Sequence, residues 1–185
     1  MQEHISEKKA AHIEKIDDPH KAFAALVDLI GRLKERYPDK TYPEERLLRD
    51  IYGPRPGKKS SLLSYTAHAG EKISGVLAGE RHDHGLFFGR LVLVDPALRG
   101  AGTLKDLFDA VKRDFSEIQL LAASSGESKD ASDEKYIDRQ NALFRVYERF
   151  GFTPVVSNEQ YQQAHQTGAA IRMVWRKEDK QTKTV

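Results

Sequence analysis

A short loop with the sequence RGAG, residues 99–102, has the composition of an anion-binding site. Gly100, Ala101 and Gly102 leave the backbone uncovered, and Arg99 offers a cationic side chain. Consecutive peptide N–H groups at the start of a helix attract anions, and a diphosphate is their natural occupant. A strand-to-helix turn that needs only the conformational freedom of glycine explains the same residues. The loop by itself therefore leaves both interpretations open.

The residues around this loop exclude two better-defined phosphate motifs. No Gly-Lys-Ser/Thr sequence follows the glycines, as a P-loop requires, and Lys105 stands where a dinucleotide-binding fingerprint has its third glycine. An apolar strand precedes the loop, and a helix with apolar residues on one face follows it. We expect Thr103 to be the N-cap of that helix, with Asp106 completing a capping box.

A second candidate is Tyr147, within the sequence LFRVYERFGF of residues 143–152. Tyr147 lies in step with Leu143, Val146 and Phe150 on one face of a predicted helix. Such spacing is typical of core packing, so the spacing alone favours a packing role for this tyrosine.

No metal site is predicted. The histidines of the sequence HDH, residues 82–84, are neighbours on a predicted hairpin turn, where adjacent side chains rarely converge on one ion. The chain has no cysteine, which excludes thiolate-bound zinc, a disulfide framework and a thiol nucleophile.

The elements that must position these residues follow the order β-α-α-β-β-β-α-β-α-β-β. This order predicts one domain, residues 10–177, with a flexible lead at 1–9 and a flexible tail at 178–185. We expect polar loops over 124–135 and 157–168. The predicted strands cover residues 11–16, 62–68, 72–80, 86–94, 117–123, 152–156 and 169–177, and the predicted helices cover 20–37, 43–53, 103–115 and 136–150.

The composition is typical of a soluble single-domain protein, with 39% hydrophobic and 31% charged residues in a chain of 185. No apolar run reaches membrane-spanning length and no secretory leader is present, so we predict a cytoplasmic protein without a membrane partner. The 30 basic and 28 acidic residues leave a net charge of +2, too small to indicate a nucleic-acid partner. Lys105, Lys112 and Arg113 form a local basic face that keeps such a partner open.

Taken together, VLVDPALRGAG (residues 92–102) and LFRVYERFGF, with a strand and a helix between them, resemble the GNAT family of acetyl-CoA-dependent N-acyltransferases. The resemblance includes the preceding three-strand meander and the closing strand pair, so it covers most of the chain. It implies an α/β (α+β) fold, with a mixed, mostly antiparallel sheet of six to seven strands flanked by about four helices. It also implies acetyl-CoA as a co-substrate and transfer of the acetyl group to a primary amine.

The family's loop pattern is Gln/Arg-x-x-Gly-x-Gly/Ala, in which backbone amides hold the pyrophosphate. Arg99 and Gly102 match the first and fourth positions, whereas Leu104 replaces the small residue at the sixth and could crowd the diphosphate. Gln140 stands where the family often has a cofactor-contacting asparagine, with Asn141 adjacent. The resemblance thus implies cofactor-binding roles for Val92, Leu93, Val94, Arg99, Gly100, Ala101, Gly102, Thr103, Leu104, Gln140 and Asn141.

For catalysis, the resemblance implies that Tyr147 protonates the departing CoA thiolate. The strand before the loop splays from its neighbour in this family and exposes an amide that polarises the thioester carbonyl. Phe88 and Leu121 occupy positions where members often carry a catalytic glutamate. The base is therefore left to a water chain or to a carboxylate of the polar loop, such as Glu127 or Asp130.

Two other functions stay open. A non-catalytic GNAT-fold binding or regulatory module would explain Leu104, Gln140 and the missing carboxylates, and an acyltransferase acting on a nucleic-acid-linked amine would use the basic helix face. The choice of acceptor between a small molecule and a protein lysine or N-terminus stays open, because this fold builds its acceptor site from its most variable segments. Homodimers are common among related folds, and the sequence is compatible with one.

Overall fold

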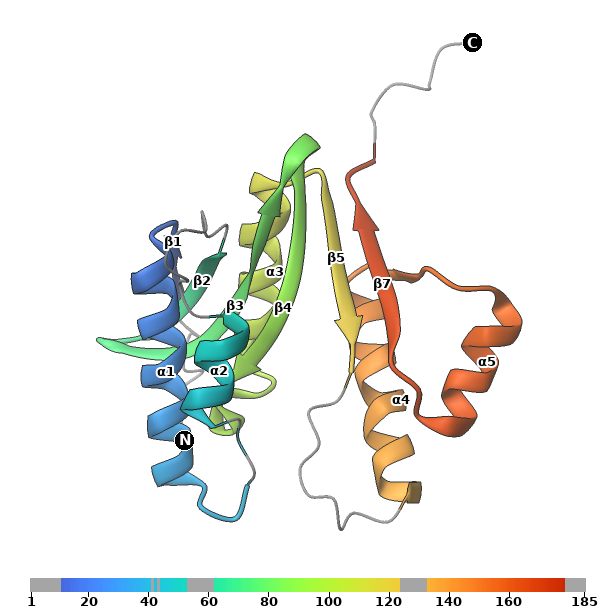
Figure 1. Cartoon of the computed structure of the whole chain (residues 1–185), viewed down its shortest axis with the longest axis horizontal. Helices are drawn as coiled ribbons and strands as arrows, with labels where there is room; N and C mark the ends of the chain where they lie inside the picture. The colour runs from blue at the N-terminus through green and yellow to red at the C-terminus, as the bar shows by residue number, and fades with distance from the viewer. Residues whose placement is uncertain (1–10, 41, 43, 53–61, 124–132, 179–185) are drawn as a thin grey trace, which may run out of the picture.

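The structure is a computed structural model that describes residues 11–40, 42, 44–52, 62–123 and 133–178 (Figure 1). The predicted lead, the tail beyond residue 178 and the segment 124–132, with Glu127 and Asp130, lie outside these residues. The strands are β1 (His12–Ile16), β2 (Leu62–Ala69), β3 (Lys72–His82), β4 (Leu86–Val94), β5 (Glu117–Ala122), β6 (Thr153–Pro154) and β7 (Ile171–Arg176), and the helices are α1 (Pro19–Arg36), α2 (Glu45–Tyr52), α3 (Thr103–Asp114), α4 (Asp133–Arg149) and α5 (Asn158–Thr167).

The strands form one seven-stranded sheet in the order β1-β2-β3-β4-β5-β7-β6. Among the strands of the described residues, only β4 and β5 pair in parallel, and the other neighbours are antiparallel. The predicted mixed, mostly antiparallel sheet is therefore confirmed. In the described part of the chain, no helix is long and apolar enough to cross a membrane.

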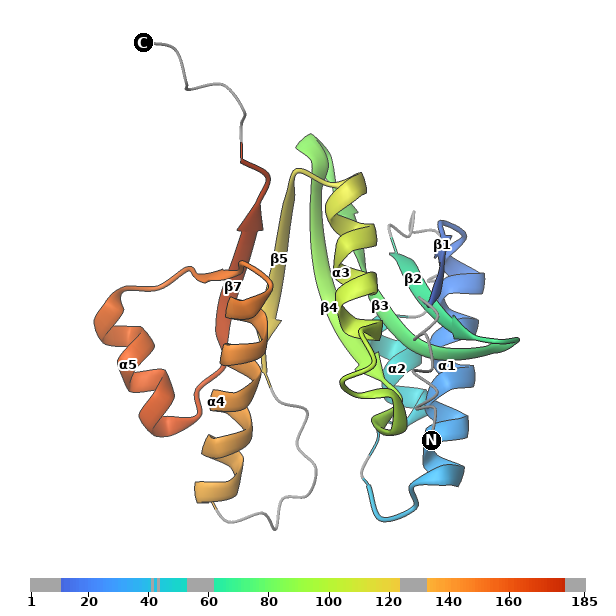
Figure 2. The same ribbon diagram turned by 180° about the vertical axis from the view of Figure 1, so that it is seen from behind.

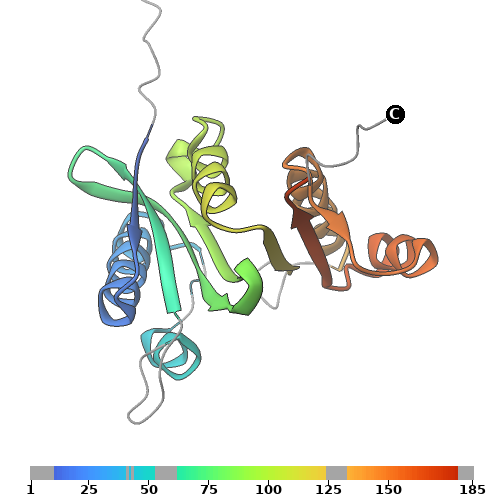
Figure 3. The ribbon, with the colours of Figure 1, turned by 90° about the horizontal axis from the view of Figure 1, so that it is seen from above.

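Helices cover both faces of this sheet, with α1 and α2 on one face and α3 and α4 on the other (Figures 2 and 3). On the first face, α1 buries an apolar stripe at the i, i+3, i+4, i+7 spacing of an amphipathic helix. On the second face, Phe108 of α3 and Tyr147 of α4 pack in one buried core, with their ring centroids 6.0 Å apart. The stripe of α1 consists of Leu26, Leu29, Ile30 and Leu33, and it packs against Val76 and Ala78 of β3.

The structure differs from the prediction over residues 157–168, where a loop was expected and α5 is found. This helix is short and mostly polar, and Ala164 is its one fully buried residue, so no apolar periodicity is visible in the sequence. The local signal was the capping box in which Ser157 and Gln160 bond each other's backbone N–H groups.

A polar cluster joins α3 to the first two strands. The hydroxyl of buried Tyr65 donates to Asp114 Oδ2 at 2.6 Å, and Lys15 Nζ lies 2.8 Å from the same oxygen. Partial burial raises the pKa of Asp114, but the hydrogen bonds from Lys15 and Tyr65 outweigh it, so the pKa lies below its ordinary value. The charged form of Asp114 therefore stabilises the fold.

We expect Asp114→Ala to lower the free energy of unfolding at pH 7 by about 2 kcal/mol, because the buried Tyr65 hydroxyl loses its acceptor. Since the folded pKa is depressed, this stabilisation is present above the unfolded pKa of about 3.9 and is lost as pH falls through the folded value. Urea unfolding at pH 7 and toward pH 3 measures both effects. Asp109→Ala on the same helix removes only the exposed ion pair with Lys105 and should change stability by less than about 1 kcal/mol. Equal losses in the two variants would contradict the prediction.

Candidate functional site: an opening between two strands and the loop beside it

Strands β4 and β5 pair over only part of their length and then separate. The paired residues are Leu86–Gly89 and Glu117–Leu120, yet β4 continues to Val94 and β5 to Ala122. Figure 1 shows the two strands diverging from their common end. A β-bulge at Arg90 interrupts the pairing of β4 with β3 just where β5 leaves. Because a bulge bends its strand, it accounts for the start of this opening.

The register of β4 decides which backbone groups face the opening. The N–H of Asp95 donates to the carbonyl of Ser74 of β3. Because every second residue of an antiparallel strand bonds to the same neighbour, the backbone groups of Leu93 also face β3. Val92 and Val94 occupy the alternate positions, and their N–H and C=O groups point toward β5. The structure thus brings Val92 and Val94 to the opening, whereas the backbone of Leu93 faces β3.

The loop after β4 presents N–H groups at the start of α3. Gly100 and Gly102 have φ values of 83° and 95°, which favour glycine. The N–H groups of Arg99 and Ala101 close turns onto Pro96 and Leu98. Within the described residues, the N–H groups of Gly100 and of residues 102–105 make no hydrogen bond. For residues 102–105 this is expected, because the first N–H groups of a helix have no partner within the helix.

The prediction that Thr103 caps α3 is wrong, because Gly102 occupies the N-cap and no side chain caps the helix. Thr103 is the first helical residue and is buried, with its methyl carbon 3.2 Å from where a side chain on Gly75 would begin. Leu104, expected to crowd the loop, is half-buried and packs against the hydrophobic core. Both residues thus direct apolar atoms inward beside an uncovered backbone.

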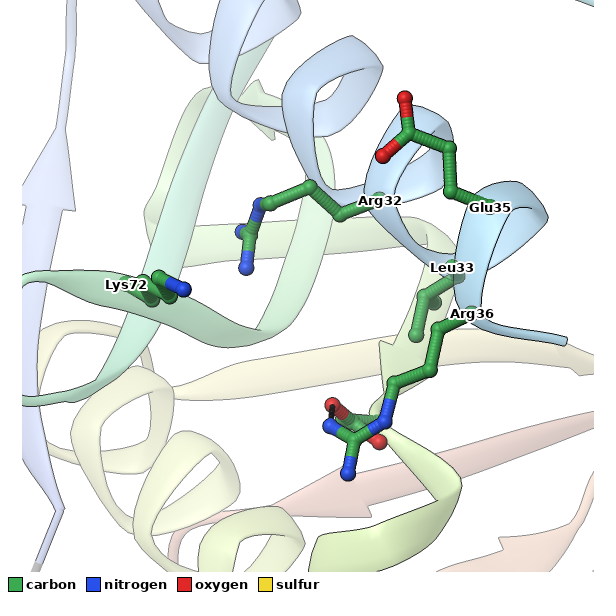
Figure 4. Close-up of a pocket in the computed structure, with 6 residues that line it drawn as sticks. Arg32, Leu33, Glu35, Arg36 and Lys72 are labelled. Carbon is green, nitrogen blue, oxygen red and sulfur yellow. Dashed lines mark hydrogen bonds and ion pairs between the residues drawn. The ribbon is translucent and has the colours of Figure 1, made fainter.

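Asp95 fixes the start of the loop. Its carboxylate accepts hydrogen bonds from Arg36 Nη1 at 3.0 Å, the Tyr37 hydroxyl at 2.9 Å and the N–H of Ala97 at 2.9 Å. Burial and this hydrogen bond raise the pKa of Tyr37, which keeps its hydroxyl a donor. Asp95 also borders a cavity of about 250 Å³ between α1 and the sheet (Figure 4), lined by Arg32, Leu33, Glu35, Arg36 and Lys72.

Gln140 and Tyr147 lie two helical turns apart on the buried face of α4. The Gln140 side chain is fully buried, and its Nε2 donates to the carbonyl of Ala122 at 2.5 Å, which connects α4 to the end of β5 that does not pair with β4. The Tyr147 ring packs against Phe108 and Phe152, with centroid distances of 6.0 and 5.8 Å. Burial raises the pKa of Tyr147 to about 12. Its hydroxyl makes no hydrogen bond with the described residues.

Asn141 points away from this site. Its Oδ1 lies 2.7 Å from His165 Nδ1, and its Nδ2 donates to the carbonyl of His165 at 3.1 Å. The structure therefore assigns Asn141 to the junction of α4 with α5 and does not bring it to the loop.

On the opposite face of the sheet, Phe88 lies between Glu80 of β3 and Gln119 of β5. Arg90 stacks on this ring, with its Cζ 4.5 Å from the centroid, and its Nη2 donates to Glu80 Oε2 at 3.3 Å. Sequence reasoning did not identify Glu80. Its carboxylate lies beside Phe88, a position where members of the GNAT family often carry a catalytic glutamate. Strand alternation gives the face of each residue, but only the cross-strand register places Glu80 opposite Phe88.

The structure resembles many solved structures over most of its length. An assigned GNAT-family acetyltransferase of Bacteroides thetaiotaomicron matches with a TM-score of 0.55 and 16% identity, covering 92% of this chain and 90% of that one. Escherichia coli ElaA matches with a TM-score of 0.53 and 15% identity, covering 90% and 99%. A GNAT-family acetyltransferase of Staphylococcus aureus Mu50 matches with a TM-score of 0.51 and 15% identity, covering 89% and 99%.

The chain thus has the fold of the GNAT acetyltransferases, which confirms the resemblance seen in the sequence at the level of the fold. No protein-family model matches the sequence, and a search of curated proteins finds no match. The roles of individual residues therefore depend on the geometry described above.

Proposed function

We propose that this protein is an N-acetyltransferase that moves an acetyl group from acetyl-CoA to a primary amine. One observation carries the proposal: the opening between β4 and β5 lies beside a glycine loop in which the N–H groups of Gly100, Gly102 and Thr103 make no hydrogen bond with the described residues. In a GNAT fold, this combination supplies a slot for an extended arm and an anion site next to it.

The described residues fit acetyl-CoA in three respects. The N–H groups of Gly100, Gly102 and Thr103 would bind the pyrophosphate, with the exposed Arg99 side chain adding a charge-assisted contact. The backbone groups of Val92 and Val94 would bind the pantetheine arm along the opening. Leu104 leaves the loop uncovered because its side chain packs against the hydrophobic core. Gln140 would position β5 through its hydrogen bond to the Ala122 carbonyl and would not contact the cofactor directly. Asn141 is left out of the proposed site because its amide is bonded to His165.

Acetyl-CoA would supply a thioester whose carbonyl carbon the amine attacks. The N–C bond forms, the C–S bond breaks with its electron pair leaving on sulfur, and the nitrogen gives up a proton. Tyr147 donates the proton that the sulfur takes up, since a hydroxyl with a pKa of about 12 stays protonated at neutral pH. Glu80 is the candidate acceptor of the amine proton, because its carboxylate lies on the open face beside Phe88.

Calorimetry tests the binding half of the proposal. Acetyl-CoA should form a one-to-one complex, and Arg99→Glu should weaken it about tenfold or more through loss of one charge-assisted contact and repulsion of the phosphates. Arg46→Glu, an exposed change on α2, should leave binding unchanged. Flat titrations at millimolar acetyl-CoA would overturn the proposal, and CoA release with a panel of amines tests turnover.

A non-catalytic binding module is the second candidate. It is favoured by the apolar residues Phe88 and Leu121, which stand at positions where the GNAT family often carries a catalytic glutamate. Binding of acetyl-CoA with no release of CoA in the presence of any tested amine would support this second candidate. The nucleic-acid alternative gains no support, because Lys105 is paired with Asp109 and Lys112 donates to the carbonyl of Phe150.

A further inference from the structure

A cluster of two arginines and two apolar side chains lies on the open face of the sheet, at the opening between β4 and β5. It consists of Phe88, Arg90, Leu121 and Arg172 and is called the arginine cluster below. Arg90 and Arg172 approach the same Phe88 ring, with their Cζ atoms 4.5 and 5.7 Å from its centroid. Leu121 is 54% exposed and lies directly across from Arg172 in the pairing of β5 with β7.

The charge of Arg172 has no counter-charge in the described residues. Arg90 is bonded to Glu80, and Arg176, two residues further along β7, donates to Glu117 Oε2 at 2.9 Å. The guanidinium of Arg172 makes no hydrogen bond or ion pair with any described residue, and it lies against two apolar side chains. A guanidinium in these surroundings is well suited to bind a carboxylate with two parallel hydrogen bonds.

Arg172 is close to the proposed place of reaction. Leu121 follows Leu120, the last residue of β5 that pairs with β4, so it borders the opening itself. Neighbouring strands lie about 4.8 Å apart, which puts the backbone of Arg172 one strand beyond that edge. The Arg172 guanidinium reaches across β5 to the Phe88 ring of β4, with Cζ 5.7 Å from the ring centroid, so an anion bound by Arg172 would lie beside the opening.

The face that carries the arginine cluster is also the one from which an amine can enter. The glycine loop opens at the start of α3, and α3 packs on the other face, so the carrier would occupy the opening from that side. Figure 1 shows β5 and β7 without a helix over them on the near face, where α1 and α2 cover only the neighbouring strands. The attacking nitrogen must approach from this uncovered face.

We propose that the acceptor is an α-amino acid whose carboxylate is bound by Arg172 while its amine faces the opening. The inference rests on the proposed acetyltransferase function and names its substrate class. The bonds formed and broken are those of the transfer described above, with the α-amino nitrogen as the attacking atom. Phe88 and Leu121 offer apolar surface to the amino-acid side chain.

The experiment compares L-amino acids with their carboxamides as acceptors, using acetyl-CoA and CoA release. Arg172→Gln should lower kcat/KM for the preferred amino acid by about 10- to 100-fold, the effect expected for losing a charge-assisted carboxylate contact, and should change kcat/KM for its carboxamide less than about twofold. Comparing each acceptor between the two proteins cancels the different basicities of the amines. Arg176→Gln, on the same strand and face, is the control and should affect both acceptors equally little.

Two outcomes overturn the inference: no amino acid is acetylated although other amines, such as peptides or polyamines, are, or Arg172→Gln lowers kcat/KM equally for an amino acid and for its carboxamide. If no amine at all is acetylated, the proposed function fails first. Calorimetry with amino acids in the presence of CoA then decides the inference separately. Binding that is lost in Arg172→Gln supports the carboxylate site, and absence of binding removes it.

Discussion

Gly102→Asp should weaken acetyl-CoA binding about 100-fold, whereas Gly102→Asn should weaken it less than about tenfold. Gly102 is the N-cap of α3, and its N–H is one of the loop donors proposed to bind the pyrophosphate. An aspartate there places a carboxylate where the phosphates would lie, and two like charges about 4 Å apart repel by several kcal/mol at a protein surface. Asparagine has the same shape without the charge. The difference between the two variants therefore isolates electrostatics from crowding.

Both substitutions strain the loop, and to a similar degree. The φ of 95° favours glycine, and Asp and Asn tolerate a positive φ better than other side chains do. A side chain at this position meets no atom within 4 Å. We expect the two variants to have midpoints of thermal unfolding within a few degrees of each other, so that the difference between their calorimetric affinities reports binding alone. Equal affinities of the Asp and Asn variants would remove the loop from the proposed phosphate site.

The sequence predicted the loop well because its signal is local. Glycines that must adopt positive φ, followed by an apolar helical pattern, can be recognised from a few neighbouring residues, and the paired motifs predicted the fold around them. Thr103 shows the limit of local reasoning. It has the side chain of an N-cap, but burial of its methyl group against β3 moved the helix start by one residue.

The acceptor side of the site could not be predicted in the same way, because it depends on register. Glu80, Phe88, Leu121 and Arg172 come from four different strands, and a shift of one residue in any pairing would turn a side chain to the other face. The predicted contact of Asn141 with the cofactor depended in a similar way on which face of α4 carries this residue. Its neighbour Gln140 faces β5, whereas Asn141, one position on, points to α5.

The two faces of the opening therefore carry different chemistry. On the face of α3 and α4 lie the backbone donors and the buried tyrosine that are proposed to serve acetyl-CoA and its sulfur. On the other face, charged side chains and exposed apolar groups are available to an acceptor. In the proposed reaction, the two substrates would bind on opposite faces of the sheet and meet at the gap between β4 and β5, where no strand pairing has to be broken to admit them.

Tyr147→Phe should lower the single-turnover rate of CoA release about 100-fold while changing acetyl-CoA affinity less than about twofold. Phenylalanine keeps the ring contacts with Phe108 and Phe152, and the lost hydroxyl has no hydrogen-bond partner among the described residues, so the fold should be unaffected. Tyr161→Phe, which removes a hydroxyl bonded to Glu148, is the matched control and should leave the rate unchanged.

The pH dependence of the reaction separates a proton donor from a packing residue. Burial raises the pKa of Tyr147 to about 12, so the hydroxyl keeps its proton through the whole range in which the amine is being deprotonated. The wild-type rate should therefore rise with pH as the amine loses its proton and stay high up to about pH 10, the ordinary pKa of tyrosine. If Tyr147→Phe gives the wild-type rate throughout that range, Tyr147 is a core residue and the sulfur takes its proton from water, since no ring contact distinguishes the two side chains.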